Sequence, residues 1–357
     1  MHPFRKLLLV SLGLESSFEK DPSPEDWHRL YATARHQALL GVLNTGVHRL
    51  PERQRPPESI LSEWDHLAGK IAEIYERHIS REAELGEILK KMGLKGCILK
   101  GTGLARLYPE PCRRQCGDID VWIQGSRKAL LKAFSDRFEV SEILYQECKV
   151  DIFDDVLVEL HFHPTKMYDP FCNARFQRWC NRNSPFADRN PGLSEDEALC
   201  YPSALFNAVF CMAHMYRHYL TGGLGIRQMM DYSYVLRELT EAERGTAMRT
   251  LKRLGMGRFT AATMLALRYN FGLEDEYLLC EPDMKRGPKL VNDLYRMGNF
   301  GILDPRNRAA KGETKLARFR RRNRRLFSNL RYYPREIIWA PFSRLAQHFW
   351  RRFRGYL

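Results

Sequence analysis

Two aspartates separated by a single residue are the strongest chemical signal in the chain. Asp118 and Asp120 open a short apolar segment that also holds Ile119, Val121 and Ile123. In a β-strand, residues two apart project from the same face, so both carboxylates would point to one side and the apolar side chains to the other. Carboxylate oxygens are the hard ligands that Mg²⁺ prefers. The spacing therefore indicates a metal site at a strand, of a kind that handles a nucleotide.

A glycine-containing turn before this strand offers a place for phosphate. Gly101 lets the backbone approach a phosphate closely, and a helix that begins near Thr102 would direct its first amides at an anion. Lys100 and Arg114 carry charges suited to a triphosphate. Two plainer interpretations stay open, namely that Lys100 is an exposed charge and that Arg114 pairs with Glu110. The chain has neither a Walker motif nor a dinucleotide-binding glycine pattern.

A pair of antiparallel strands is predicted after the Asp-x-Asp segment. Residues 149–153 and 156–163 alternate in polarity across the turn at 154–155. On the second strand Glu159 shares a face with His161 and His163. We expect His161 either to line the site or to orient a ligand. His163, farther along, is expected to be structural.

Six blocks follow one another in order along most of the chain. They are Leu99-Lys-Gly-Thr-Gly-Leu-Ala-x-Leu-Tyr-Pro109, Arg114-x-x-Gly-Asp-Ile-Asp120, Val158-Glu-Leu-His161, His214-x-x-x-His218, Gly225-Ile-Arg227 with Asp231, and Tyr333-Pro to Phe342. Together they resemble the poorly characterised bacterial nucleotidyltransferase family of the polymerase-β-like superfamily. The resemblance implies a small mixed sheet with flanking helices, and nucleotidyl transfer from a nucleoside triphosphate.

The resemblance also implies roles for individual residues. In the superfamily a glycine turn precedes the Asp-x-Asp strand and a third carboxylate comes from a later strand. The matching positions are Gly101 with Thr102, Asp118 with Asp120, and Glu159. The chain departs from the superfamily at the turn, where Lys-Gly-Thr replaces Gly-Ser. The chemistry of the residues agrees, because three carboxylates can hold two metal ions, Mg²⁺ or Mn²⁺, about 3.5–4 Å apart.

The hypothesised reaction is metal-dependent transfer of a nucleoside monophosphate from a nucleoside triphosphate, such as ATP, to an unknown acceptor. Pyrophosphate leaves, and Glu159 or Asp120 is the candidate base for the acceptor hydroxyl. Two other hypotheses stay open. One is a binding module that holds nucleotide without turnover. The other is a membrane-associated accessory protein for the modification of a cell-surface polysaccharide or peptide.

Helices are expected on both sides of this core. Helical signals cover residues 24–50, 57–92 and 194–270, and a crossover helix capped by Ser126 covers 126–138. Residues 165–194 are expected to be irregular. The prediction is an α+β protein, a minimal polymerase-β-like nucleotidyltransferase mixed sheet between helical regions. Its expected parts are an N-terminal helical region 1–93, a nucleotidyltransferase core 94–165, a helical region 166–303 and a basic aromatic tail 304–357.

Two further pairs have helical spacing. His214 and His218 are expected to be pocket wall or satisfied buried groups, since the glutamate of a zinc protease motif is missing. Arg227 and Asp231 form either a helix-surface pair or a substrate contact. Cys112 and Cys116 lack the partners that a structural zinc site needs.

The positive charge of the chain lies in its tail. Residues 301–357 hold 16 Lys and Arg against 3 Asp and Glu, a balance of +13 out of +14 for the whole chain. Arginines cluster at 318–325, and aromatic residues interleave with further arginines up to Tyr356. Three interpretations are open: a helix on an anionic membrane surface, a grip on nucleic-acid phosphates, or a helix docked on the core with a solvated arginine face.

The expected location is the cytoplasm, with the tail as a means of peripheral attachment to the inner membrane face. The apolar run at residues 4–14 lacks a cleavage site and is expected to be a core helix rather than a signal peptide. No apolar run reaches the roughly 20 residues of a membrane span. The nine cysteines have no short paired spacing and are expected to be reduced thiols.

Overall fold

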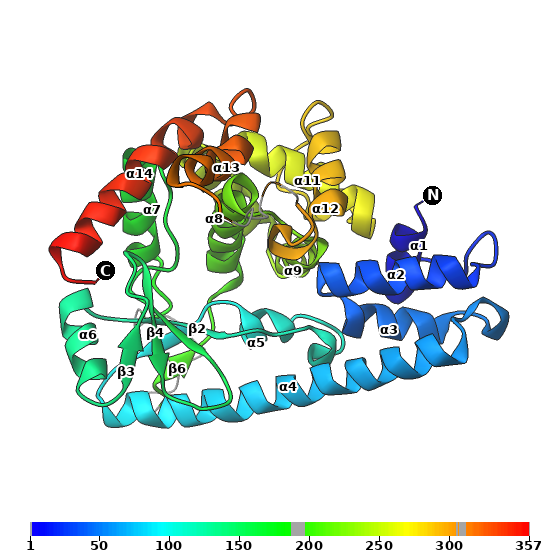
Figure 1. Cartoon of the computed structure of the whole chain (residues 1–357), viewed down its shortest axis with the longest axis horizontal. Helices are drawn as coiled ribbons and strands as arrows, with labels where there is room; N and C mark the ends of the chain where they lie inside the picture. The colour runs from blue at the N-terminus through cyan, green and yellow to red at the C-terminus, as the bar shows by residue number, and fades with distance from the viewer. Residues whose placement is uncertain (1, 187–196, 305, 307–311, 357) are drawn as a thin grey trace.

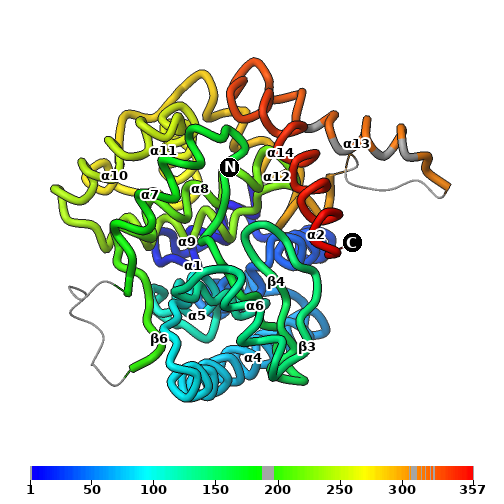
Figure 2. Tube along the Cα trace, turned by 90° about the vertical axis from the view of Figure 1, so that its left-hand side faces the viewer, coloured from blue at the N-terminus to red at the C-terminus, as the bar shows by residue number. Residues whose placement is uncertain are grey.

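The computed structural model describes residues 2–186, 197–304, 306 and 312–356, and it shows an α+β protein (Figure 1). The helical segment expected at 194–270 begins at Ser194, which lies outside the described residues. Figure 2 shows two layers: the sheet and the long helix α4 form one, and the helices from α7 onward form the other.

A six-stranded mixed sheet forms the lower layer, as the sequence predicts. Its order is β3-β4-β5-β2-β1-β6, with β2–β5 and β1–β6 parallel and the other pairs antiparallel. The predicted hairpin is confirmed as the β4–β5 pair. The strands are β1 Gly96–Ile98, β2 Ile119–Ile123, β3 Glu139–Ser141, β4 Glu147–Asp151, β5 Val158–His161 and β6 Leu199–Cys200.

Helices surround the sheet before and after it in the sequence. In chain order they are α1 Pro3–Ser11, α2 Pro24–Gln37, α3 Leu40–Arg49, α4 Glu58–Lys91, α5 Gly101–Ala105, α6 Arg127–Ser135, α7 Pro170–Arg182, α8 Ala204–Thr221, α9 Ile226–Arg237, α10 Glu241–Arg253, α11 Gly257–Phe271, α12 Gly287–Met297, α13 Lys315–Ser328 and α14 Pro334–Phe353. None of these described helices is long and apolar enough to cross a bilayer.

Local capping chemistry sets several of these ends. Ser23 and Asp26 form a capping box at the start of α2, and the Ser126 hydroxyl accepts a hydrogen bond from the backbone N–H of Ala129 in α6. The long helix α4 stops just before Gly93, whose φ of +66° suits a residue without a Cβ. The sequence predicts these boundaries because each depends on neighbouring residues only.

The single helical segment expected at 24–50 is two helices. The chain leaves α2 at Ala38, which has a left-handed φ of +54°. The buried Gln37 side chain fixes this break, because it donates to the carbonyl of Leu294 and accepts from the N–H of Ile226. Partners so far away in the sequence give no local signal.

The irregular structure expected for residues 165–194 is wrong at its centre, where α7 lies. Asp169 caps the helix through its carboxylate. Cys172, Phe176 and Cys180 recur every four residues and are buried. This apolar stripe was the available signal, and the surrounding Arg and Asn residues obscured it.

The sheet separates two apolar cores. Ile119 and Val121 pack in a core with Leu85 of α4 and Phe134 of α6. Trp122 faces the other way and stacks on an aromatic side chain of α8 with ring centroids 5.7 Å apart. The face division predicted for this strand is therefore confirmed, and the side that carries Asp120 looks toward the helical layer.

Candidate active site

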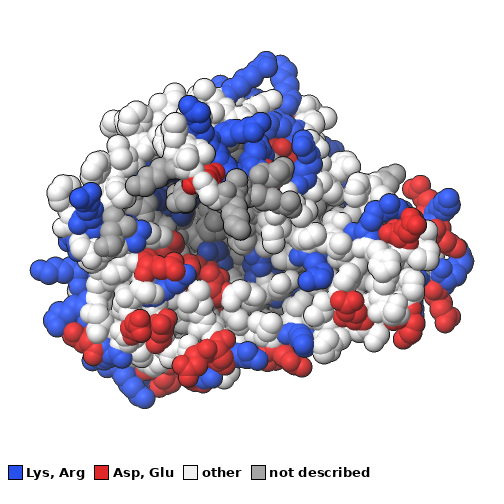
Figure 3. All heavy atoms as spheres, viewed as in Figure 1, with Lys and Arg blue, Asp and Glu red and all other residues white. Residues whose placement is uncertain are grey.

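All predicted site residues except Thr102 line one cavity of about 590 Å³ between the sheet and the helical layer. In the view of Figure 3 the molecule is hollowed between its upper and lower halves. The strands and the turn before α5 contribute Lys100, Gly101, Asp118, Asp120, Glu147, Glu159 and His161. The opposite wall, from α8 and α9, contributes His214, Arg217, His218, Arg227, Gln228 and Asp231.

Strand register places two carboxylates side by side. In the parallel β2–β5 pair, Asp120 is the direct partner of Glu159, and Trp122 is the partner of His161. Adjacent strands lie about 4.8 Å apart, so the two carboxyl groups share one small region. Asp118, half-buried directly before β2, lines the same cavity.

Asp120 is the centre of the cluster. Its Oδ1 atom lies 2.9 Å from Nε2 of His161 and 2.8 Å from Nζ of Lys100. Ligand atoms of Asp120, Glu159 and His161 all lie within 4.8 Å of one another. The structure thus brings His161 into the group. It favours the role of orienting a ligand, since the imidazole N–H donates to the Asp120 carboxylate.

Burial and charge set the protonation of the acids. Burial acts to raise the pKa of Asp120, but the charges and hydrogen bonds of Lys100 and His161 outweigh it and hold that pKa well below its usual range. Burial, together with the charges of Asp120 and Asp118, raises the pKa of Glu159 to about 7. Burial and the neighbouring Asp120 also raise the pKa of Asp118.

The donor set fits a divalent cation. Asp120, Glu159 and His161 offer two carboxylate oxygens and an imidazole nitrogen within 4.8 Å of one another, and Asp118 lines the same cavity. The Lys100 ammonium group lies 2.8 Å from Asp120 and supplies a positive charge beside that carboxylate.

Metal binding should release a proton. Glu159 must lose its proton to act as a ligand, and its pKa is about 7 in the metal-free protein. We expect Mn²⁺ binding to strengthen as pH rises from 6 to 8 and to release close to one proton at the lower pH. Calorimetry in two buffers of different ionisation enthalpy measures this release.

The Glu159→Gln variant is the matched control, because it should bind Mn²⁺ more weakly and without that proton release. Proton release that is unchanged in this variant would assign the titration to another group and contradict the prediction.

The glycine turn lies against the residue that precedes β2. Gly101 has a φ of +51°, and a Cβ placed on it would come within 3.4 Å of the carbonyl oxygen of Asp118. The Thr102 hydroxyl donates to Glu82, a buried residue of α4 that also accepts a hydrogen bond of 3.0 Å from Tyr201. Thr102 therefore ties the turn to α4, and Lys100 and Gly101 are the turn residues that line the cavity.

Arg114 does not pair with Glu110, the partner considered in the sequence analysis. Its Nε and Nη2 atoms donate to Asp231 at 2.7 and 2.8 Å, and both residues are buried. Glu110 pairs instead with Arg113. The alternative of an Arg227–Asp231 pair on a helix surface is also wrong, because Asp231 is buried with Arg114 and Arg227 lines the cavity.

His214 and His218 of α8 form part of the cavity wall, which is one of the two roles that the sequence predicts for them. Their ring centroids lie 4.3 Å apart. Burial and nearby cations lower the pKa of His218 to about 3, and they lower the pKa of His214 well below its usual value. Both rings are therefore neutral at pH 7. His163 stacks on Tyr145 with centroids 5.3 Å apart.

Besides cavity-lining residues such as Arg217 and Gln228, sequence reasoning missed three described residues that contact groups it had singled out. Glu147 opens β4, lines the cavity and places Oε2 3.7 Å from Nδ1 of His161. Glu82 holds the glycine turn from α4, as described above. Phe300 lines the cavity from a segment outside the predicted core and lies with its ring centroid 5.0 Å from that of His218. Each joins the site only through folding, so no local pattern marked them.

The comparisons with known proteins give one match. A family model described as an uncharacterised nucleotidyltransferase matches residues 23–272. No curated protein and no solved structure matches the chain. The matched span contains the strands of the sheet and the α8–α9 wall of the cavity.

Proposed function

Because this chain belongs to the uncharacterised nucleotidyltransferase family, we propose that it transfers a nucleoside monophosphate from a nucleoside triphosphate to an acceptor and releases pyrophosphate. One observation supports this most strongly. Asp120, Glu159 and His161 cluster with Asp118 in a single cavity, beside a lysine and a glycine turn. Phosphoryl transfer depends on positioning and charge neutralisation, and these residues can supply both.

Asp118, Asp120 and Glu159 would hold the metal. A bound Mg²⁺ or Mn²⁺ would neutralise charge on the triphosphate and make the acceptor oxygen more nucleophilic. His161 positions Asp120 through its hydrogen bond of 2.9 Å. Glu159 and Asp120 are the candidate bases for the acceptor hydroxyl, and without metal Glu159 has the higher pKa of the two.

Lys100 and Gly101 carry the phosphate-binding part of the proposal. Both line the cavity next to the carboxylates, where a triphosphate must lie to share the metal. We place Thr102 and Arg114 in a supporting role, since Thr102 donates to Glu82 and Arg114 pairs with Asp231. The donor is ATP or another nucleoside triphosphate.

Labelled substrates test the proposal. The full chain is incubated with each α-labelled nucleoside triphosphate, Mg²⁺ or Mn²⁺ and a cell extract, and both label transfer and pyrophosphate are measured. We expect one donor to label an acceptor with equal release of pyrophosphate. Nucleotide binding without pyrophosphate under every condition would contradict transfer and support the binding-module hypothesis.

A membrane-associated accessory role is the second candidate, and the tail favours it. Such a role is compatible with catalysis, because the near-neutral body holds the site while the +13 tail can determine where the protein lies. Binding of nucleic acid by the tail is the weaker proposal, because the exposed face of α14 includes aliphatic side chains that cannot stack on bases.

A further inference from the structure

The last helix carries an unusual row of exposed apolar side chains. Ile338, Phe342, Leu345, Phe349 and Phe353 of α14 are 47% to 87% exposed. Steps of three and four residues put all five on one face of the helix. We call this row the α14 stripe. A continuous exposed apolar surface of this kind marks an interaction site.

The opposite face of α14 is attached to the body. Ile337 and Ala340 are buried there. Glu336 accepts backbone hydrogen bonds from Tyr168 at 2.6 Å and from Asp169 at 3.1 Å. The stripe is thus presented outward by a helix whose orientation is fixed by its other side.

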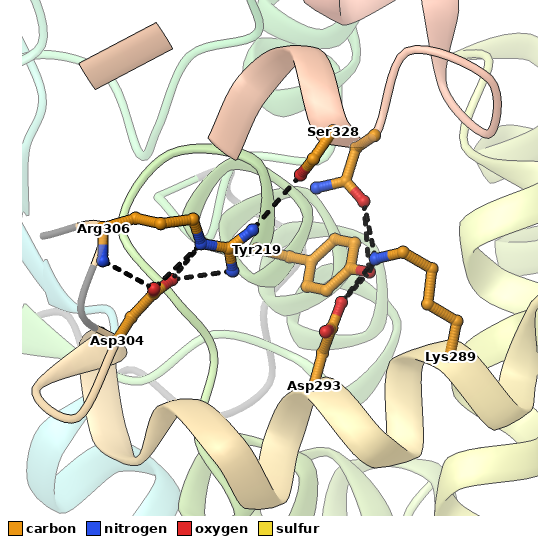
Figure 4. Close-up of polar contacts among 7 residues, drawn as sticks. Tyr219, Lys289, Asp293, Asp304, Arg306 and Ser328 are labelled. Atoms are coloured by element: carbon orange, nitrogen blue, oxygen red, sulfur yellow. Dashed lines mark hydrogen bonds and ion pairs between the residues drawn. The ribbon is translucent and has the colours of Figure 1, made fainter. Parts of the chain in front are cut away.

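Helix α13, which precedes α14, is anchored at its C-terminal end. Lys289 Nζ donates to Tyr219 at 2.9 Å and to Asp293 at 2.5 Å, and also to Asn329 directly after α13 (Figure 4). Arg306 adds a bond of 3.3 Å to Ser328. Figure 2 shows the N-terminal part of α13 extending away from the body. This helix adds three more exposed apolar side chains, namely Leu316, Phe319 and Phe327, and Leu330 follows directly after it.

Positive charge surrounds these apolar residues. Arg320, Arg324, Arg331, Arg352 and Arg354 are exposed on α13, on α14 and at their ends. The three acidic residues of the tail are each engaged: Asp304 with Arg306, Glu313 with Arg321, and Glu336 with backbone amides. Lys and Arg gather over α13 at the top of the view in Figure 3. The exposed surface of the tail is therefore apolar and cationic together.

We propose that α13 and α14 dock on an anionic phospholipid surface, with α14 lying in the interface and the α14 stripe inserted among the acyl chains. The chemistry selects this occupant. Ile338 and Leu345 gain from burial in hydrocarbon but offer no ring for stacking on bases, so the stripe is a poor match for nucleic acid. A second copy would bring two strongly cationic tails together, which electrostatic repulsion opposes.

This docking would hold the cavity close to the membrane. The Nζ atom of Lys166 donates to Gln347 of α14, and its neighbour Thr165 lines the cavity. The inference rests on the surface of the tail and not on the proposed reaction, so either can fail without the other.

Vesicle binding by the full chain tests the inference. Sedimentation is compared on vesicles of phosphatidylcholine alone and of equal parts phosphatidylcholine and phosphatidylglycerol. We expect binding to the anionic vesicles only, and we expect it to weaken in about 0.5 M salt, where exposed charges are screened. No binding to anionic vesicles would overturn the proposal.

Paired substitutions separate the stripe from charge alone. Phe342→Ser combined with Phe349→Ser should weaken binding to anionic vesicles about 30-fold or more, because two large apolar side chains no longer insert. Met284→Ser removes an apolar side chain that is 70% exposed in the loop before α12, and it should leave vesicle binding unchanged. All these side chains are exposed, so each variant should keep the melting temperature of the parent.

Three outcomes would overturn the proposal even if the parent protein binds. The double variant binds as tightly as the parent. The parent is a dimer by light scattering and the double variant a monomer, which would make the stripe an interface between copies. The parent binds single-stranded RNA more tightly than anionic vesicles and the double variant loses that RNA binding.

Discussion

The Asp120→Asn variant should lose nucleotidyl transfer, with kcat lower by about 10³-fold or more. The metal contribution to such a reaction is several kcal/mol, and each 1.36 kcal/mol is a factor of ten in rate. Asparagine keeps the size of the side chain but removes the charge that Lys100 and His161 contact at 2.8 and 2.9 Å. Because Asp120 is itself a buried ion-pair partner, the melting temperature measured beside kcat separates loss of the site from loss of stability.

The measurement compares pyrophosphate release and Mn²⁺ affinity for the parent, Asp120→Asn and Asp118→Asn. Asp154→Asn is the matched control, since Asp154 is an exposed carboxylate in the β4–β5 turn. It should retain full activity. Undiminished transfer by Asp120→Asn together with Asp118→Asn would remove these residues from the reaction and with them the proposed mechanism.

The Asp231→Asn variant should be the least stable of the single substitutions considered, by about 3 kcal/mol in the free energy of unfolding. Removing one partner of a buried ion pair leaves an uncompensated charge, which costs about 3–5 kcal/mol. Arg114 would lose the charge that accepts its bonds of 2.7 and 2.8 Å, and Tyr108 donates to the same carboxylate at 2.6 Å.

Urea unfolding followed by circular dichroism measures this difference. The control is Asp136→Asn, which breaks the exposed pair with Lys132 and should change the free energy of unfolding by less than about 0.5 kcal/mol. Replacing Arg114 by Met together with Asp231 by Leu should recover part of the loss, because no charge is then left buried. Parent-like stability of Asp231→Asn would show that this pair does not hold the cavity wall.

The family match and the tail concern separate parts of the chain. The match covers residues 23–272 and includes the carboxylate cluster, whereas α13 and α14 lie beyond it. If both proposals hold, the part matched by the family model performs the transfer and the tail brings it to an anionic surface.

Local sequence patterns predict much of the fold and part of the site. The expected starts near residues 24 and 126 and the expected end near residue 92 agree with helix ends at Ser23, Ser126 and Gly93, because caps act within one turn. The alternation around Asp118 and Asp120 predicted which face of β2 carries the acids, since strand periodicity is local. Helix α7 was missed although its apolar stripe was present, and the αL break at Ala38 was missed because Gln37 is held by distant partners.

The sequence alone determined which chemical groups the protein has: the Asp-x-Asp pair, the glycine turn, Glu159, and a cationic tail on a near-neutral body. Only the tertiary structure decided how these groups meet. Parallel pairing of β2 with β5 places Glu159 beside Asp120, and this proximity helps to raise the pKa of Glu159 to about 7. Arg114 pairs with Asp231, 117 residues away in the sequence, and not with Glu110. Caps and periodicity act between neighbours in sequence, whereas pKa values and buried ion pairs depend on distances through space, and those distances exist only after the sheet and the helical layer have packed together.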